Sequence, residues 1–372
     1  MVEYMENKVL KPKIRFKGFT DTWEQRKLEG IYKFQYGEFN NNPSNGGIYP
    51  VYGANGIIGG YTNYNAENSV IIGHMGEYAG SVLWGNGKHF VTYNGTISKP
   101  RGENVVSKFG YYMLYQKDIN KICGGSGLPF LSYEQLNKIE VCYPKDIKEQ
   151  KSIANYLTNI DNLITLHQSK YDKLVNVKKA LLEKMFPKDG KNVPEIRFKG
   201  FTDTWEQRKL KDESDYIVAG GDIEKNKIDE NGKYPVIANA LTNEGIVGYY
   251  KEDYRIKAPA VTVTGRGDVG HAVARNIDFT PVVRLLTIKS KHYNYFLENA
   301  INNLNVVVES TGVPQLTVPQ LENYEIQFPK DLNEETQIGN LFKQIDNLIT
   351  LHQHKLEKLK NMKKSLLNKM FI

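Results

Sequence analysis

Two stretches of the chain carry the same alternation of apolar and polar residues. From Ile153 to Met185, and again from Ile338 to Met370, apolar residues recur in alternating steps of four and three. A spacing that averages about 3.5 residues places these side chains on one stripe of an α-helix and is typical of a coiled coil. At about 1.5 Å per residue, each predicted helix is roughly 50 Å long. The pattern therefore predicts two long helices that pair with each other.

The apolar stripe is interrupted at two positions in each helix. His167 and Lys178 in the first stretch have His352 and Lys363 as counterparts in the second. Polar residues at such positions fix the register and orientation of paired helices, and we prefer this role to a metal site because no further ligands cluster near the histidines. Leucines beside the stripe widen the apolar face beyond one partner helix, so we expect another protein to cover it. The residues assigned to helix pairing and partner docking are Ile160, Leu163, Ile164, Leu166, Leu174, Leu181, Ile345, Leu348, Ile349, Leu351, Leu359 and Leu366.

The duplication extends over the whole chain. Sixteen of the seventeen residues in the segment 12–28 recur in the segment 194–210. The sequence GLPFLS at 127–132 has GVPQLT at 312–317 as its counterpart. Between these matched ends, residues 29–125 and 211–309 share only scattered features. A common scaffold that presents two different specificities explains this arrangement simply.

Each dissimilar insert is predicted to combine short strands with a helix. Segments rich in Val, Ile, Tyr and Thr and cut by glycine indicate strands, and they lie at 48–61, 69–75, 81–100, 234–250, 260–274 and 282–288. Helices are predicted at 107–122 and at about 292–304. A Ser or Thr three residues before a Gln predicts a capping box at Ser132 and at Thr317, followed by strands at 139–143 and 324–328. The fold class is α/β (α+β).

The short connection between the first helix and the second half restricts the arrangement. Only the seven residues 187–193 separate the end of the first long helix from the repeated segment 194–210 that opens the second half. They reach about 25 Å at most, so we expect the second globular part near the far end of the first helix and the paired helices antiparallel, with pseudo-two-fold symmetry. The predicted domains are globular parts at 1–145 and 191–330 and helices at 146–190 and 331–372.

Composition narrows the class of protein further. A length of 372 residues with 40% apolar composition fits two domains, and a net charge of +7 permits a polyanionic partner. The two cysteines, Cys123 and Cys142, are too few for a disulfide scaffold or a four-Cys zinc site. The first residues form no signal peptide, and no stretch approaches the ~18 apolar residues of a membrane span. We therefore expect a soluble cytoplasmic protein.

Together these segments resemble the DNA-specificity subunit of Type I restriction-modification systems. The resemblance rests on RFKGFTDTWEQRKL in each half, on GLPFLS and GVPQLT, and on the two IDNLITLHQ helices. It implies two target-recognition domains, each reading one half of a split site in double-stranded DNA. It also implies that the helices dock two methyltransferase subunits, with two endonuclease or translocase subunits as further partners. S-adenosylmethionine, ATP and Mg²⁺ are then expected on the partner subunits and no cofactor on this chain.

Polar and aromatic residues on the glycine-rich turns are the candidates for DNA contact. Arg can bind guanine bidentately, and Asn or Gln can pair with adenine. The first-half candidates are Tyr52, Asn55, Tyr64, His74, Tyr78, Lys88, Arg101 and Ser126. The second-half candidates are Asn239, Asn243, Arg266, His271, Arg275, Thr311 and Gln315. For any one of them, a solvated loop position or a buried structural role is the competing interpretation.

Two other functions compete with DNA recognition. A self-contained DNA methyltransferase would show Asn or Asp before Pro-Pro and an aromatic residue, and the segment 42–44, Asn-Pro-Ser, lacks the second proline. The GxGxxG at 265–270 is followed by an alternating strand pattern instead of a helix, which argues against a nucleotide site. No Walker-type loop is present, so the sequence predicts no catalytic residue. A protein-binding adaptor explains the helices but not two unlike inserts in matched frames.

Overall fold

The computed structural model describes residues 10–40, 46–124, 128–188, 190–304 and 314–372. The chain divides into two compact units. Unit 1 comprises Met1–His167 and Lys355–Ile372, and unit 2 comprises Gln168–His354. Each unit therefore contains the start of one long helix and the end of the other.

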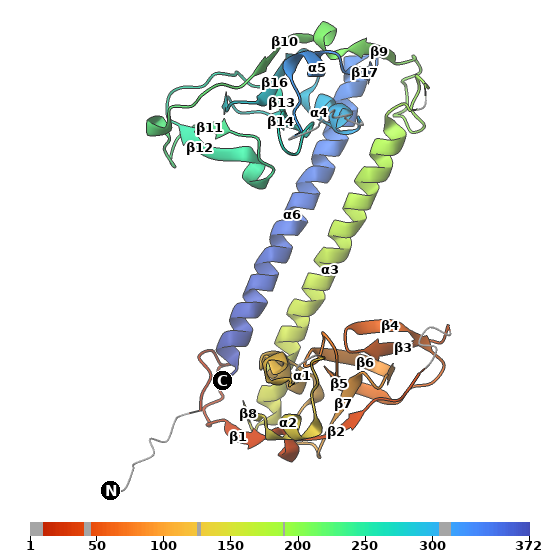
Figure 1. Ribbon diagram of the computed structural model, residues 1–372, viewed down its shortest axis with the longest axis vertical. Helices are drawn as coiled ribbons and strands as arrows, with labels where there is room; N and C mark the ends of the chain where they lie inside the picture. Colours follow the sequence, from red (N-terminus) through yellow and green to blue (C-terminus); the bar gives the residue numbers. More distant parts are fainter. Residues whose placement is uncertain (1–9, 41–45, 125–127, 189, 305–313) are drawn as a thin grey trace. The chain divides into compact units, whose positions relative to one another are not determined.

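The helices and strands follow the duplicated order along the chain (Figure 1). The first half contains β1 (Glu24–Lys27), β2 (Tyr32–Tyr36), β3 (Tyr49–Gly53), β4 (Gly56–Tyr61), β5 (Ala66–Gly73), β6 (Val82–Val91), β7 (Gly95–Pro100), α1 (Ser107–Tyr115), α2 (Tyr133–Lys138), β8 (Glu140–Tyr143) and α3 (Ile147–Met185). The second half contains β9 (Glu206–Lys209), β10 (Ser214–Ala219), β11 (Tyr234–Ile237), β12 (Ile246–Tyr250), β13 (Ala260–Thr264), β14 (Ala272–Arg275), β15 (Thr280–Pro281), β16 (Leu285–Ser290), α4 (Asn294–Asn302), α5 (Val318–Glu322), β17 (Glu325–Phe328) and α6 (Leu332–Met370).

The two inserts share one sheet topology despite their different sequences. Unit 1 has a six-stranded sheet in the order β2-β7-β5-β6-β3-β4, in which β6 pairs with both β5 and β3. Unit 2 repeats this order as a four-stranded sheet, β10-β16-β13-β14, and a three-stranded sheet, β12-β11-β15. The single strand β6 is replaced by the short strands β14 and β15, because the irregular residues 276–279 interrupt it. The two inserts thus keep the same strand order although the second divides it between two sheets.

The repeated opening segment closes the core of each unit. In unit 1, Arg15 donates two hydrogen bonds to the Glu149 carboxylate, at 2.6 and 2.7 Å, near the start of α3. Its copy Arg197 holds Glu334 near the start of α6 at 2.6 and 2.8 Å. Both glutamates are 1% exposed, so each bidentate pair compensates a buried charge.

A tryptophan from the same segment packs against a phenylalanine at the end of a long helix. The rings of Trp23 and Phe371 lie 6.2 Å apart in unit 1, and those of Trp205 and Phe186 lie 5.9 Å apart in unit 2. The end of α6 therefore completes the core of unit 1, and the end of α3 completes that of unit 2. Each helix closes the core of the half to which it does not belong in sequence.

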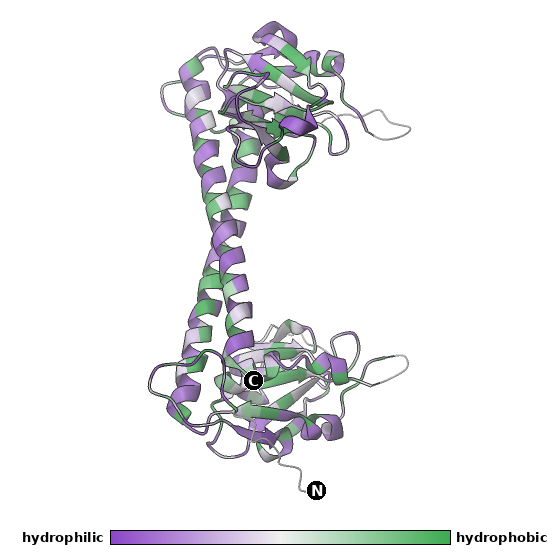
Figure 2. Cartoon of the chain, turned by 90° about the vertical axis from the view of Figure 1, so that its left-hand side faces the viewer, coloured by the Kyte–Doolittle hydropathy of each residue, from purple (hydrophilic) through white to green (hydrophobic). Residues whose placement is uncertain are grey.

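Within each unit the two long helices lie side by side, and their surface alternates between hydrophobic and hydrophilic residues (Figure 2). In unit 2, Lys178 of α3 donates to Asp346 of α6 at 2.6 and 2.8 Å. Directly after the end of α3, the ring of Phe186 lies 6.1 Å from that of Phe342. The paired segments therefore run antiparallel, as predicted. In unit 1 the counterpart pair is Lys363 with Asp161 at 2.7 Å, so both lysines in the stripe find a carboxylate on the opposite helix.

Local predictions agree with most of these elements. Both capping boxes are present, at Ser132 before α2 and at Thr317 before α5. The helix predicted over 107–122 is shorter, because α1 ends at Tyr115 and Asp118 adopts a left-handed φ of 46° before a 3-10 turn. The alternating pattern that follows the GxGxxG segment corresponds to β14 (Ala272–Arg275), which confirms that this segment does not open a helix.

Candidate nucleic-acid interface

A tight turn follows β5 in unit 1 and brings together parts of the chain that are distant in sequence. The backbone N–H of Leu131 donates to the carbonyl of His74, and that of Gly76 donates to Pro129, both at 2.9 Å. The His74 side chain is buried, its Nδ1 lies 3.0 Å from the Leu131 carbonyl, and its ring lies 3.9 Å from that of Tyr36. Burial lowers the pKa of His74. His74 thus anchors the turn as a neutral side chain.

Unit 2 has the corresponding turn after β13. The N–H of Leu316 donates to the Gly265 carbonyl at 2.9 Å, and the N–H of Gly267 donates to Pro314 at 3.4 Å. The half-buried side chain of Asn239 accepts from the Gly265 N–H at 2.8 Å and donates to the Val283 carbonyl at 3.1 Å. Arg266 and Gln315 face each other across an isolated β-bridge, and both are exposed.

Most first-half candidates lie on the surface of unit 1. Asn55, Tyr64, Tyr78, Lys88 and Arg101 are exposed, whereas Tyr52 and His74 are buried. The Lys88 ammonium lies 4.6 Å from the centroid of the Tyr64 ring, and Arg101 Nε donates to the Tyr32 carbonyl at 3.1 Å. The Tyr52 ring packs 5.3 Å from that of His89 in the core. Ser126 lies outside the described residues.

The second-half candidates divide in the same way. Asn243, Arg266, His271 and Gln315 are exposed. Arg275 is 8% exposed and donates to Thr262 Oγ1 and to the Glu244 carbonyl, both at 3.0 Å, so its observed contacts are structural. His271 and Arg275 line a cavity of about 500 Å³. Thr311 lies outside the described residues.

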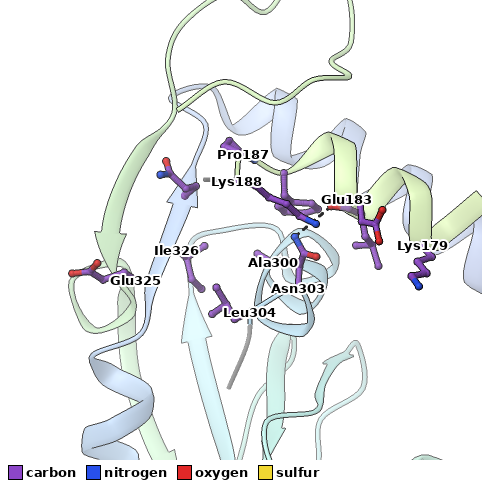
Figure 3. Close-up of a pocket in the computed structure, with 12 residues that line it drawn as sticks. Lys179, Glu183, Pro187, Lys188, Ala300, Asn303, Leu304, Glu325 and Ile326 are labelled. Atoms are coloured by element: carbon purple, nitrogen blue, oxygen red, sulfur yellow. Dashed lines mark hydrogen bonds between the residues drawn. The ribbon is translucent and has the colours of Figure 1, made fainter. Parts of the chain in front are cut away.

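Another cavity, of about 490 Å³, lies where the end of α3 meets α4 and β17 (Figure 3). Lysines and glutamates both line it, and Asn303 Nδ2 donates to the Leu182 carbonyl at 3.3 Å. Throughout the described ranges, no group of three or more His, Cys, Asp or Glu side chains is placed to hold a metal ion. In the same ranges, no helix is long and apolar enough to span a membrane.

Comparison with known proteins assigns the family. The sequence pattern of the Type I restriction modification DNA specificity domain matches residues 20–176 and again residues 202–361, most of the chain. The chain belongs to this family. It is the DNA-specificity subunit of a Type I restriction-modification system, a non-catalytic subunit that recognises DNA within a multisubunit enzyme.

Relatives of this specificity subunit come from bacteria and archaea. It is 27% identical over 296 residues to a protein assigned as a type I specificity subunit in Mycoplasma pneumoniae, covering 77% of this chain and 78% of the relative. It is 24% identical over 337 residues to the Type I restriction enzyme MjaVIII specificity subunit of Methanocaldococcus jannaschii, covering 81% and 78%. The crystal structure of a Type I restriction-modification S subunit from M. genitalium matches with a TM-score of 0.78 at 15% identity, covering 97% of this chain and 99% of that one. That likeness shows the fold.

The long helices of the specificity subunit have an inner and an outer apolar surface. Ile160 and Ile345 on the stripe are 3% and 7% exposed. Half-buried positions of the stripe are Ile164, Leu174, Leu181, Ile349, Leu359 and Leu366. By contrast, Leu163 and Leu166 in unit 1 are 43% and 47% exposed, and their counterparts Leu348 and Leu351 in unit 2 are each 44% exposed. Each unit therefore presents the same pair of exposed leucines.

Lys108, Met75 and Phe130 were not proposed from the sequence as candidates for DNA contact. Lys108 lies 4.4 Å from the Trp84 ring centroid and 4.8 Å from that of Tyr111, and burial lowers the pKa of Lys108 to about 8. Met75 and Phe130 face each other across a β-bridge at the first turn and are 38% and 40% exposed. A search for polar residues passes over Met75 and Phe130. Aligning the two halves at the GLPFLS and GVPQLT segments would have indicated Phe130.

Proposed function

We propose that the protein reads a bipartite site in double-stranded DNA, with one half-site recognised by each insert. The observation that carries the proposal is the shared sheet order of two inserts whose sequences differ. Two domains that recognise different base sequences require different surface residues, and they can share one backbone scaffold. Such a protein works in the compartment that holds the DNA, which we take to be the cytoplasm.

The domain boundaries proposed for this function follow the sequence. Target-recognition domains occupy residues 1–145 and 191–330, and spacer helices occupy 146–190 and 331–372. The exposed candidates on the turns supply the DNA contacts, namely Asn55, Tyr64, Tyr78, Lys88, Arg101, Asn243, Arg266, His271 and Gln315. Buried Tyr52, His74 and Arg275 and half-buried Asn239 act by holding the turns and strands that present them.

The exposed leucine pairs are proposed to dock two methyltransferase subunits, one on each unit. Large apolar side chains repeated at equivalent positions mark a surface that another protein covers. Because each unit carries one pair, two identical partners have equivalent binding surfaces. Endonuclease subunits would join the complex through these partners, and S-adenosylmethionine, ATP and Mg²⁺ belong to those other subunits.

Charged substitutions at one leucine pair are expected to remove one methyltransferase subunit. Replacing Leu163 and Leu166 by Asp should weaken that docking surface at least tenfold, since a buried anchor of an interface contributes about 2 kcal/mol or more. Native mass spectrometry of the assembled complex should then show one methyltransferase fewer. The control changes are Asn176→Asp and Asn361→Asp at exposed helix positions. A complex with both subunits retained would contradict the docking proposal.

Methylome sequencing of cells that contain the chain with its methyltransferase partner tests the recognition proposal. We expect one bipartite motif with a fixed gap between its halves. Exchanging residues 29–125 for the corresponding insert of a relative should change one half of the motif and leave the other half and the gap unchanged. A continuous motif, or a change in both halves, would overturn the proposal. Methylation by the purified chain alone would instead indicate a self-contained methyltransferase.

A further inference from the structure

The two turns described above are the same structural device, built from different residues. In unit 1, Gly76 has φ 80° and Gly80 has φ 81°, and in unit 2, Gly267 has φ 78° and Gly270 has φ 88°. The N–H of Gly80 donates to the Gly73 carbonyl at 2.9 Å, and that of Gly270 donates to Thr264 at 2.8 Å. Left-handed φ values at both glycines keep the backbone path the same in the two units.

The bridge at each turn is equivalent as well. Met75 faces Phe130 in unit 1, and Arg266 faces Gln315 in unit 2. Phe130 and Gln315 occupy the same position of the repeated GLPFLS and GVPQLT segments. The backbone is thus held constant at this bridge while an apolar pair is exchanged for a polar pair.

The two pairs differ in how far the fold uses their side chains. Arg266 and Gln315 are exposed. Met75 and Phe130 are 38% and 40% exposed, and the Phe130 ring also packs 4.8 Å from the His74 ring. Within the part of the chain that the structure describes, no hydrogen bond or ion pair is recorded for the Arg266 guanidinium or the Gln315 amide. The backbone hydrogen bonds, Asn239 and His74 already hold the turns. The pairs are therefore available to an external ligand.

We propose that these bridges are base-reading positions of opposite chemistry, an inference that rests on the proposed reading of a split DNA site. Arg266 and Gln315 read hydrogen-bonding edges in the major groove, with Arg266 bound to O6 and N7 of a guanine. Met75 and Phe130 read an apolar feature at the equivalent place in the other half-site, the 5-methyl group of a thymine. One scaffold thereby assigns guanine recognition to one half-site and thymine recognition to the other.

The decisive variant in unit 2 is Arg266→Lys, assayed in the complex with the methyltransferase subunits. Lysine keeps the positive charge for a phosphate contact but loses the bidentate fork that selects guanine. We expect relaxed preference at one guanine of the second half-site by about tenfold or more. The first half-site serves as the internal control and should be unchanged. An unaltered motif, or a uniform loss of affinity across all sequences, would show that Arg266 is not a base reader.

The thymine contact is tested with modified duplex oligonucleotides that carry the motif found by methylome sequencing. Replacing the contacted thymine by deoxyuridine removes only the 5-methyl group, and it should weaken binding of the native complex severalfold. The double variant Met75→Ala and Phe130→Ala should bind both duplexes equally. In unit 2, 7-deazaguanine at the contacted guanine removes the N7 acceptor and should weaken the native complex but not the Arg266→Lys complex.

Failure of this inference differs from failure of the proposed function. If methylome sequencing yields no bipartite motif, the proposed function fails. If the motif appears but neither half-site responds to the bridge variants or the modified bases, the assignment of the bridges is wrong while the recognition role stands. Thermal unfolding of the Arg266→Lys variant should match that of the native chain because the Arg266 side chain is exposed. The Met75→Ala and Phe130→Ala double variant is judged by its equal binding of the two duplexes, a comparison that a uniform loss of stability does not produce.

Discussion

Replacing His292 by valine is expected to lower the free energy of unfolding of unit 2 by about 3–5 kcal/mol. His292 Nδ1 lies 2.8 Å from Glu335 Oε1, and Nε2 lies 2.8 Å from Glu213 Oε2. The three side chains are 4%, 0% and 6% exposed. Removing the imidazole leaves the Glu335 carboxylate buried without its cation, and an uncompensated buried charge is costly.

Unit 1 supplies the control for this prediction. In unit 1, the backbone N–H of Val106, which precedes α1, donates to the Gln150 side chain at 2.8 Å. In unit 2, the N–H of Tyr293, which precedes α4, donates to Glu335 at 3.3 Å. The neutral amide of Gln150 therefore occupies in unit 1 the place that the Glu335 carboxylate occupies in unit 2. The double variant His292→Val and Glu335→Gln should recover most of the lost stability. Chemical denaturation with hydrogen exchange resolved for unit 2 measures both variants. A double variant as unstable as the single one would contradict the charge argument.

The same cluster gives unit 2 a pH dependence of known sign. Burial lowers the pKa of His292, but hydrogen bonds to Glu335 and Glu213 outweigh it and raise the pKa above its usual value. The stabilisation from protonated His292 is complete below the pKa of histidine in the unfolded chain, about 6.5, and is lost as the pH rises through the folded pKa. Burial raises the pKa of Glu213, but Arg208, His292 and Lys291 together lower it to about 2. Its contribution is present above the unfolded value and is lost as the pH falls toward 2.

The stability advantage of the native chain over the double variant should therefore narrow as the pH rises from about 6.5 through the raised folded pKa of His292. Denaturation midpoints of the two proteins, measured from pH 6 upward, test this sign. A gap that widens with rising pH would contradict it.

Inserting one heptad into both long helices is expected to lengthen the gap of the recognised motif by about 3 base pairs. Seven residues add roughly 10 Å of helix, and B-DNA rises ~3.4 Å per base pair. Insertions after Gln168 and Gln353 fall at equivalent positions and keep the apolar stripe in phase. Methylome sequencing of the variant should show both half-sites unchanged and a longer gap.

Two controls separate this effect from damage to the helices. A heptad inserted in α3 alone should reduce methylation without producing a new motif of longer gap, because α3 and α6 then differ in length and no longer pair over their whole length. Three residues inserted in both helices shift the apolar stripe and should reduce thermal stability. An unchanged gap in the matched variant would show that helix length does not set the spacing of the half-sites.

Features set by local sequence were the easiest to predict. The alternating steps of four and three predicted α3 and α6, and a hydroxyl residue three positions before Gln predicted both capping boxes. The paired lysines were recognised as polar positions in the stripe, but their partners Asp161 and Asp346 became evident only once the helices were placed side by side.

Features that depend on distant contacts could not be predicted in this way. Arg15 and Glu149 are 134 residues apart, and nothing near either one indicates the other. The division of the second sheet follows from a short interruption between β14 and β15, whose effect depends on the neighbouring strands. For the DNA candidates, sequence could indicate exposed turns but not which side chains, such as Arg275, bind their own protein instead.

The completion of unit 1 by the end of α6 has a consequence for biosynthesis. Unit 2 is one continuous segment, so all of its residues are synthesised before the segment Lys355–Ile372 that completes unit 1. Unit 1 lacks Leu367, Met370 and Phe371 of its core until this last segment of α6 has been made. The amino-terminal half is therefore synthesised first but completes its core later than unit 2 does, and a nascent chain that stalls before Leu367 has an unfinished amino-terminal core.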